Sequence, residues 1–225
     1  MKQSIRILST KKLLVNQKQF LLNANMSVVE ADFISINQKK VAIETVNENL
    51  IFTSQNAVLS LIENLDLTEN LDLLRKKNVF CVGLKTKSLL EENGFNVIAY
   101  TGYAADLAEI ITLIYAKEKF TFFSGNLRRD TLPETLSNAK VVFNEIEVYE
   151  TILTPQKMNG TFDGILFFSP SGVESYLKNN KITTENCFCI GTTTGETLEK
   201  ITNKIIIANQ PSVENVIIQC INEYK

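Results

Sequence analysis

The chain has 225 residues with 44% apolar and 21% charged side chains, which is the composition of an ordinary globular protein of one large or two small domains. Lys plus Arg number 23 and Asp plus Glu number 25, and the net charge of -2 argues against a nucleic-acid partner, because nucleic-acid-binding proteins usually carry a basic excess. No run of about 18 apolar residues is present and the N-terminus has no signal-peptide core, so we expect no membrane association and a cytoplasmic location.

Short apolar runs alternate with segments of helical periodicity along the chain. In chain order, the runs that predict strands are Ile5–Leu8, Phe33–Ile36, Leu50–Phe52, Val79–Val82, Val97–Tyr100, Phe120–Phe123, Val141–Phe143, Ile165–Phe168, Phe188–Ile190 and Ile205–Ala208. The spacing i, i+3, i+4, i+7 is typical of a helix with one buried face, and it occurs in Ala104, Leu107, Ala108 and Ile111 and again in Val213, Val216, Ile217 and Cys220. Continuous apolar strands separated by helices predict the α/β class, with doubly wound parallel sheets.

Two pairs of motifs recur in the same order along the chain. The segment IFTSQNAV (51–58) is similar to FFSPSGV (167–173), and each contains a strand end, hydroxyl residues and a helix start. The segment CVGLKTKSLL (81–90) is similar to CIGTTTGETL (189–198), and in both a glycine precedes a threonine by three positions. This repetition predicts two similar α/β domains.

The later motif pair lies close to the C-terminus and needs a first strand for its sheet. We expect the N-terminal apolar run to supply it, which gives a discontinuous domain of residues 1–33 plus 154–225. Residues 37–148 then form an inserted α/β domain. The linkers 34–36 and 149–153 are expected to act as a hinge.

Several kinds of chemistry are absent from the sequence. There is no histidine, which removes the commonest general base and the commonest metal ligand. Cys81, Cys187, Cys189 and Cys220 lie in or beside apolar strands or on an apolar helix stripe, so we expect buried thiols. Their spacing does not resemble a zinc site, and the sequence contains neither a P-loop nor a GxGxxG turn after a strand. We therefore expect no metal site.

The expected strands end in Ser, Thr and Gly, and ligands of open α/β sheets bind beyond the carboxyl ends of the strands. These ends are Ser9-Thr10, Thr53-Ser54, Gly83, Ser124-Gly125, Ser169–Gly172 and Gly191–Thr194, each ahead of an expected helix. A helix start offers unpaired N–H groups and a partial positive charge, which suit an anion. Ordinary N-capping accounts for any single one of these ends. Their number favours an anion-binding cleft for a ligand with several separated negative groups.

Taken in order, FTSQNAV, VGLKT, SGNLRRDTLPETL, VYET, FFSPSGV and IGTTTGETL resemble the uroporphyrinogen-III synthase family, and the likeness runs from ILSTK to the final helix. The resemblance implies two α/β domains joined by a two-stranded linker, with the N-terminal strand in the second sheet. It also implies a lyase of porphyrin and haem biosynthesis. Such an enzyme closes hydroxymethylbilane, a linear tetrapyrrole octacarboxylate, into uroporphyrinogen III with inversion of the last ring and loss of water, using no metal or organic cofactor.

The family's motifs place its site on residues of this sequence. The tyrosine of VYxT is Tyr149, and we expect it to protonate the departing hydroxide, because a phenol is a proton donor at neutral pH. The substrate-binding positions that the resemblance implies are Thr53, Ser54, Thr86, Ser124, Gly125, Ser169, Ser171, Gly172, Thr193 and Thr194. Many relatives have Arg-Pro after the first strand, where this chain has Lys11-Lys12, and we expect Lys11 to supply the cation there.

Two other functions stay open on the sequence alone. A phosphosugar-type isomerase uses similar strand ends but usually needs a Glu or His base, and Glu145, Glu147 and Glu150 have no obvious partner in the sequence. A two-domain anion-binding module is the second alternative. In each case we expect a monomer that takes a small-molecule ligand. Adding hydroxymethylbilane and separating the product isomers distinguishes all three.

Overall fold

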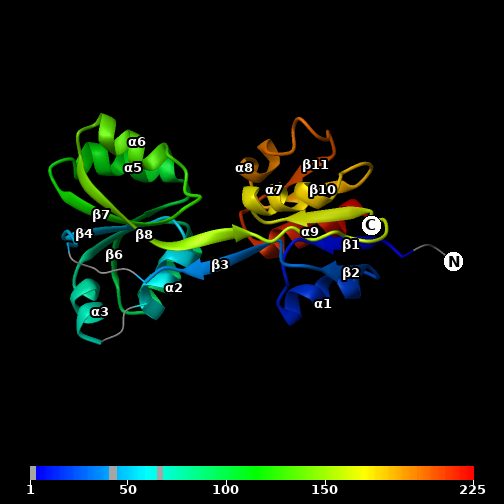
Figure 1. Ribbon diagram of the computed structural model, residues 1–225, viewed down its shortest axis with the longest axis horizontal. Coiled ribbons are helices and arrows are strands. Elements are labelled where there is room, and N and C mark those ends of the chain that lie inside the picture. The colour runs from blue at the N-terminus through cyan, green and yellow to red at the C-terminus, as the bar shows by residue number, and fades with distance from the viewer. Residues whose placement is uncertain (1–3, 41–44, 65–67) are drawn as a thin grey trace. The chain divides into compact units, whose positions relative to one another are not determined.

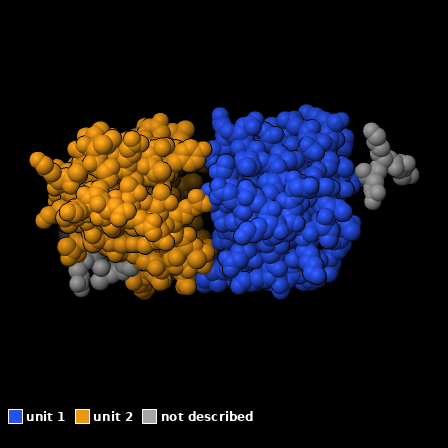
Figure 2. Space-filling model, turned by 90° about the horizontal axis from the view of Figure 1, so that it is seen from above, with its two compact units in different colours: residues 1–35, 152–225 blue, residues 36–151 orange. Residues whose placement is uncertain are grey.

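The computed structural model describes residues 4–40, 45–64 and 68–225, and the chain divides into two compact units (Figures 1 and 2). Unit 1 comprises Met1–Ser35 and Ile152–Lys225, and unit 2 comprises Ile36–Thr151. The chain therefore passes from one unit to the other after Ser35 and again after Thr151. The linkers expected from the sequence were 34–36 and 149–153.

Unit 1 is built on a five-stranded parallel sheet in the order β11-β10-β9-β1-β2. Its strands are β1 (Arg6–Ser9), β2 (Ser27–Glu30), β9 (Gly164–Phe167), β10 (Asn186–Cys189) and β11 (Ile205–Ile207). Its helices are α1 (Val15–Asn23), α7 (Pro170–Asn179), α8 (Thr192–Glu196) and α9 (Val213–Glu223). Leu21 and Val216 bring α1 and α9 onto the face of the sheet that contains Ile7, whereas Val173 brings α7 onto the face that contains Leu8. Both faces of the sheet are covered.

Unit 2 is built on a six-stranded sheet in the order β3-β8-β7-β4-β5-β6. Its strands are β3 (Ile34–Gln38), β4 (Asn49–Phe52), β5 (Asn78–Val82), β6 (Asn96–Thr101), β7 (Lys119–Gly125) and β8 (Val142–Leu153). All are parallel except β3, which is antiparallel to β8: the Thr154 N–H bonds the Phe33 carbonyl at 2.9 Å and the Lys39 N–H bonds the Val148 carbonyl at 3.0 Å. The pairing of β3 with β8 forms the expected two-stranded connection.

Helices lie on both faces of the unit 2 sheet (Figure 1). They are α2 (Gln55–Asn64), α3 (Thr68–Arg75), α4 (Leu84–Glu92), α5 (Ala104–Ile114) and α6 (Thr131–Asn138). Successive residues of a strand point to opposite faces, so Leu50 and Phe52 pack with α2, α3 and α4 while Ile51 packs with α5 and α6. Burial on both faces explains the unbroken apolar runs of the central strands. The expected α/β class with two doubly wound sheets is confirmed.

Two strands differ from the sequence-based expectation. Strand β2 was not expected, because SVVE at the edge of a sheet contains only two apolar residues. Strand β8 was expected only as the run Val141–Phe143, whereas it extends to Leu153. Its polar residues mask the strand pattern in the sequence, yet Glu145 and Glu147 are ion-paired in the folded chain.

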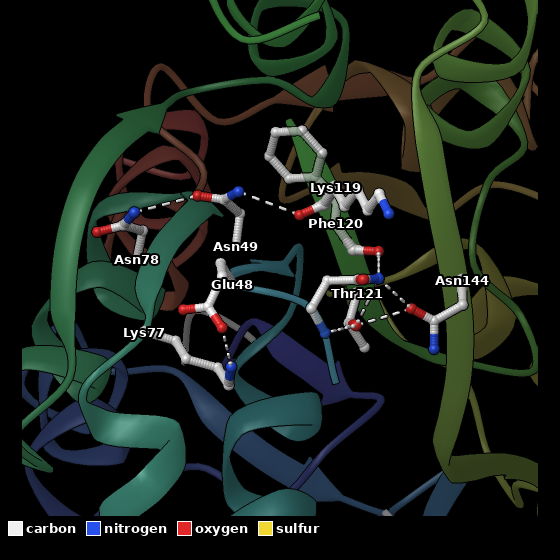
Figure 3. Close-up of polar contacts among 9 residues, drawn as sticks. Glu48, Asn49, Lys77, Asn78, Lys119, Phe120, Thr121 and Asn144 are labelled. Atoms are coloured by element: carbon white, nitrogen blue, oxygen red, sulfur yellow. Dashed lines mark hydrogen bonds and ion pairs between the residues drawn. The ribbon is translucent and has the colours of Figure 1, made fainter. Parts of the chain in front are cut away.

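Polar side chains also fill the amino edge of the unit 2 sheet (Figure 3). The Asn49 amide donates to the Lys119 carbonyl at 3.0 Å and accepts from the Asn78 amide at 3.2 Å, and the Thr121 hydroxyl donates to Asn144 at 2.7 Å. These groups satisfy one another, as buried polar groups must. The amino edge is therefore structural, and a ligand site is to be sought at the carboxyl edge.

Candidate functional site

Each sheet has one place where the order of its strands reverses. In unit 1 the chain runs from β1 outward to β2 and then continues through β9 on the other side of β1, and in unit 2 it does the same with β7 on the other side of β4. Ligands of doubly wound sheets bind beyond the carboxyl ends of the strands at such a reversal. The chain that follows these strands carries Lys11 and Ser169 in unit 1, and Thr53 and Ser54 in unit 2. Most of the site residues expected from the sequence thus lie at or beside the reversals.

At the unit 1 reversal, Ser169 caps helix α7. Its Oγ accepts a hydrogen bond from the Gly172 N–H at 3.0 Å and lies 3.0 Å from the Ser171 Oγ. Only one of the two hydroxyls donates to the other, so the pair keeps one O–H group for a ligand. Pro170 at the first helical position removes an N–H that would otherwise lack a partner. Capping and ligand binding are therefore compatible here.

Lys11 supplies an exposed cation at the same reversal. Its Nζ lies 5.8 Å from the centre of the Phe168 ring, which follows β9. Within residues 4–40, 45–64 and 68–225, Lys11 has no carboxylate partner, whereas the adjacent Lys12 lies 3.9 Å from Asp32. Of the two lysines, Lys11 is the one whose charge is available to an anion.

The repeated glycine–threonine motifs place one threonine beside each reversal. Gly83 has a φ of 90°, a conformation that favours glycine, and it precedes α4, in whose first turn Thr86 is buried. Gly191 precedes α8 in extended backbone with φ of -171°, and Thr194 is buried there beside the half-buried Thr193. The two helices that follow these motifs are less alike than expected, because α8 has only five residues and α4 has nine. In the part of the chain that the structure describes, neither threonine hydroxyl bonds another protein group, and neither is fully enclosed, because Ser175 Oγ is the only enclosed side-chain oxygen or nitrogen there without a partner.

At the unit 2 reversal, a serine and a threonine follow strand β4. The Ser54 Oγ accepts from the Asn56 N–H at 3.1 Å, which leaves its own O–H free to donate, and Thr53 is half-buried. The helices that were expected directly after the ends of β1 and β7 begin several residues later. Helix α1 starts at Val15 and α6 at Thr131, because turns intervene.

Ser124 and Glu145 belong to an ion-pair network at the end of β7. The Ser124 hydroxyl donates to Glu145 Oε1 at 2.6 Å, and Arg128 grips the same carboxylate through Nε at 2.6 Å and Nη2 at 2.9 Å. Burial works against ionisation of Glu145, but the hydrogen bonds from Arg128 and Ser124 outweigh it and hold the carboxyl pKa below its usual value. The expectation that Glu145 and Glu147 lack partners is wrong, since Glu147 bonds Lys39 at 2.5 Å.

Tyr149 lies on β8 opposite the last residue of β7. The two strands pair in register at Gly125 and Tyr149, after an irregularity that follows Ser124. The phenol ring lies directly against Gly125, because a Cβ added at Gly125 would be 2.3 Å from Tyr149 Cζ and 2.5 Å from Cε2. Only 9% of Tyr149 is exposed. The Tyr149 ring therefore packs directly on Gly125, which we call the seat of the ring. The sequence motif did not reveal this role.

A polar pocket of about 460 Å³ opens beside this seat. Gly125, Asn126, Arg128, Asp130, Glu145 and Glu147 line it. Arg128 is bound to both Glu145 and Asp130, so its charge is already balanced. The pocket is therefore not a general anion site. Asn126 had no signal in the sequence beyond its place in SGNxxR.

The cysteines take no part in this chemistry. All four are free and buried, and burial raises the pKa of each thiol to about 12, so they are protonated at neutral pH and are not nucleophiles. Among the described residues, no three His, Cys, Asp or Glu side chains are grouped so that they could hold a metal ion. No helix in that part of the chain is long and apolar enough to cross a membrane.

Comparison with known proteins gives consistent results. The sequence model of the family described as "Uroporphyrinogen-III synthase HemD" matches residues 21–218. A protein of Chlorobaculum parvum named uroporphyrinogen-III synthase is 27% identical in an alignment 176 residues long, which covers 70% of this chain and 72% of that protein. The crystal structure of uroporphyrinogen-III synthetase from Helicobacter pylori has a TM-score of 0.76 at 19% identity, covering 98% of this chain and all of that one. A mutant uroporphyrinogen III synthase from Thermus thermophilus has a TM-score of 0.68 at 15% identity and covers 98% of each chain.

Proposed function

Because this chain belongs to the uroporphyrinogen-III synthase family, a family of cyclising hydro-lyases of tetrapyrrole biosynthesis, we propose that Tyr149 starts its reaction as a proton donor. The reaction closes hydroxymethylbilane into uroporphyrinogen III, with inversion of the last pyrrole ring and loss of water. Neither a phosphosugar isomerase nor a simple anion-binding module agrees with this family.

The first step breaks the C–O bond of the hydroxymethyl group. The pyrrole nitrogen lone pair expels the oxygen, which leaves poorly as hydroxide and well as water. In our proposal the Tyr149 phenol transfers its proton to the departing oxygen, and an azafulvene cation and a phenolate remain. General acid catalysis of this kind contributes about 10²–10⁴-fold to a rate.

The second stage forms a carbon–carbon bond and needs no further acid. The substituted α-carbon of the last ring attacks the cation and forms a spiro intermediate. The bond from that carbon to the bridge of the third ring then breaks, which leaves an azafulvene cation on the third ring, and the free α-carbon of the last ring bonds this bridge carbon, so the ring is inverted. Aromatisation then releases one proton, which restores the Tyr149 phenol. The balance is the loss of one water molecule. Unguided closure gives the isomer without inversion, so most of the enzyme's work is to hold one conformation of the chain.

Neutral donors suit the task of holding a flexible octacarboxylate. Hydroxyl and backbone N–H groups bond carboxylates without leaving cations buried and unpaired when no substrate is bound. The neutral donors that we propose for this role belong to Thr53, Ser54, Thr86, Ser169, Ser171, Thr193 and Thr194, and Lys11 adds an exposed cation. Gly172 has a structural role instead, because its backbone N–H already bonds the Ser169 Oγ. Ser124 and Gly125 act indirectly in this proposal, because Ser124 bonds Glu145 and Gly125 seats the Tyr149 ring.

The observation that carries the proposal is the contrast between the two edges of the unit 2 sheet. At the amino edge, Asn78 donates to Asn49, Asn49 donates to the Lys119 carbonyl, and Thr121 donates to Asn144. At the carboxyl edge, the Thr53, Thr86 and Tyr149 hydroxyls bond no other group among the described residues, and none of the three is fully enclosed, since Ser175 Oγ is the only enclosed side-chain oxygen or nitrogen there without a partner. Donors that the fold does not use are free for a substrate.

The substitution Tyr149→Phe tests the role of the phenol. We expect kcat to fall about 10²-fold or more, with the remaining product shifted toward the isomer without inversion. Tyr176→Phe is the matched control, since Tyr176 is equally an aromatic core residue but packs against Phe33 and Phe167 in unit 1. Chromatography of the product isomers, together with thermal unfolding of both variants, is the measurement. A Tyr149→Phe enzyme with a normal rate and isomer ratio would remove the phenol from the chemistry.

We further propose that the protein acts in the cytoplasm as a monomer, without nucleic acid. The net charge is -2, which gives no basic excess for a polyanion. All four cysteines are free thiols, as is usual in a reducing compartment. Size-exclusion chromatography with light scattering tests the oligomeric part of this proposal.

A further inference from the structure

Asn126, the residue after Gly125, holds strand β8 close to Tyr149. Its side-chain Oδ1 accepts from the Thr151 N–H at 2.8 Å, and its Nδ2 donates to the Thr151 carbonyl at 3.3 Å. Its own backbone N–H donates to the Tyr149 carbonyl at 3.4 Å. Strand β7 ends at Gly125, so the carboxamide takes the place of the next peptide group in the ladder. The chain thereby keeps β8 paired beyond the end of its neighbour.

The same loop is fixed to β8 on the other side of Tyr149. Arg128 and Ser124 both bond Glu145, which lies four residues before Tyr149 on β8. Tyr149 is therefore bracketed by Glu145 on one side and Thr151 on the other. The ring between them lies on Gly125, the last residue of β7, which the loop directly follows. A shift of this loop relative to β8 moves the seat of the ring.

We propose that Asn126 is a positioning residue, which holds the Tyr149 ring in its orientation by fixing the end of β7 to Thr151. The part of this proposal that concerns the reaction rests on the proposed role of the phenol. Asn126 is exposed, so water replaces its hydrogen bonds when the side chain is removed, and the fold survives the substitution. Its effect is on geometry more than on stability.

The first test observes the ring without using activity. The protein is labelled with 3-fluorotyrosine, and the fluorine resonance that disappears in Tyr149→Phe is assigned to Tyr149. We expect that resonance to shift or broaden in Asn126→Ala. Asn180→Ala is the matched control, because the Asn180 amide likewise clamps backbone groups, at Met158 and Gln156, but in unit 1. An unchanged Tyr149 resonance in Asn126→Ala would overturn the proposal.

The second test is a kinetic double-mutant cycle with hydroxymethylbilane. We expect Asn126→Ala to lower kcat about 10-fold with KM changed less than about twofold, as for a group that acts in the transition state. Added to Tyr149→Phe, the same substitution should cause no further loss. An equal loss in both backgrounds would show that Asn126 does not act through the phenol and would overturn its part in the reaction. If instead Tyr149→Phe has a normal kcat while the resonance still shifts in Asn126→Ala, the proposed function fails and the positioning of the ring stands.

Discussion

Replacing Gly125 with alanine adds one methyl group where the Tyr149 ring lies. The new Cβ would be 2.3 Å from Cζ, 2.5 Å from Cε2 and 2.8 Å from Cε1 of that ring. Carbon atoms in contact are normally about 3.5–4.0 Å apart, so the ring must move by about 1 Å or more. Overpacking of this size destabilises a protein by about 1–3 kcal/mol. Misplacing a reacting group by about 1 Å can lower the rate about 10²-fold.

The assay compares Gly125→Ala with Gly102→Ala. Gly102 is the matched control, because a Cβ there would have no neighbour within 4 Å. We expect Gly125→Ala to lower the melting temperature by about 2–4 °C for each kcal/mol lost and to reduce kcat about 10²-fold. Gly102→Ala should leave both quantities nearly unchanged. Equal melting temperatures and rates for the two variants would refute the idea that Gly125 seats the ring.

Three further substitutions test the cap of α7 and the ion pair of Glu145. Ser169→Ala and Ser212→Ala each remove an N-cap and should cost about 1 kcal/mol, but only Ser169→Ala should raise KM, and equal KM values would exclude Ser169 from substrate binding. Glu145→Gln should destabilise the protein by about 1 kcal/mol at neutral pH. The native pKa of Glu145 lies below its usual 4.5, so its stabilisation is present above pH 4.5 and is lost as the pH falls through the native pKa. Thermal unfolding should therefore show the two proteins converging in acid, and a gap that widens there would contradict the ion pair.

The central strands could be predicted from the sequence because they are buried on both faces. Phe52 and Phe80 stand in unbroken apolar runs, and Phe123 stands in a run that only Thr121 interrupts. The apolar residues of the neighbouring helices recur with the spacing of a helix that buries one face. The edge strand β2 and most of β8 could not be predicted in this way. Their polar residues are tolerated because tertiary partners satisfy them, and those partners are far away in the sequence.

The candidate site was predictable only where its residues are marked by a local pattern in the sequence. Hydroxyl residues at strand ends are local signals, and Ser54 and Ser169 lie at the reversals of strand order that the topology creates. The roles of Asn126 and Glu145 depend on contacts across 25 and 17 positions of sequence. Nothing local distinguishes those contacts, because they exist only once β7 and β8 pair.

The division of unit 1 has a consequence for the order in which a nascent chain can fold. The N–H of Arg6 bonds the Asp163 side chain, 157 positions later, and β9 pairs with β1 along the same edge. During synthesis, all of unit 2 leaves the ribosome before β9 is made. The edge of β1 that pairs with β9 therefore stays unpaired while the sheet of unit 2 can already form. An open edge invites pairing with another chain. At four residues, β1 is short enough to offer little to such an encounter.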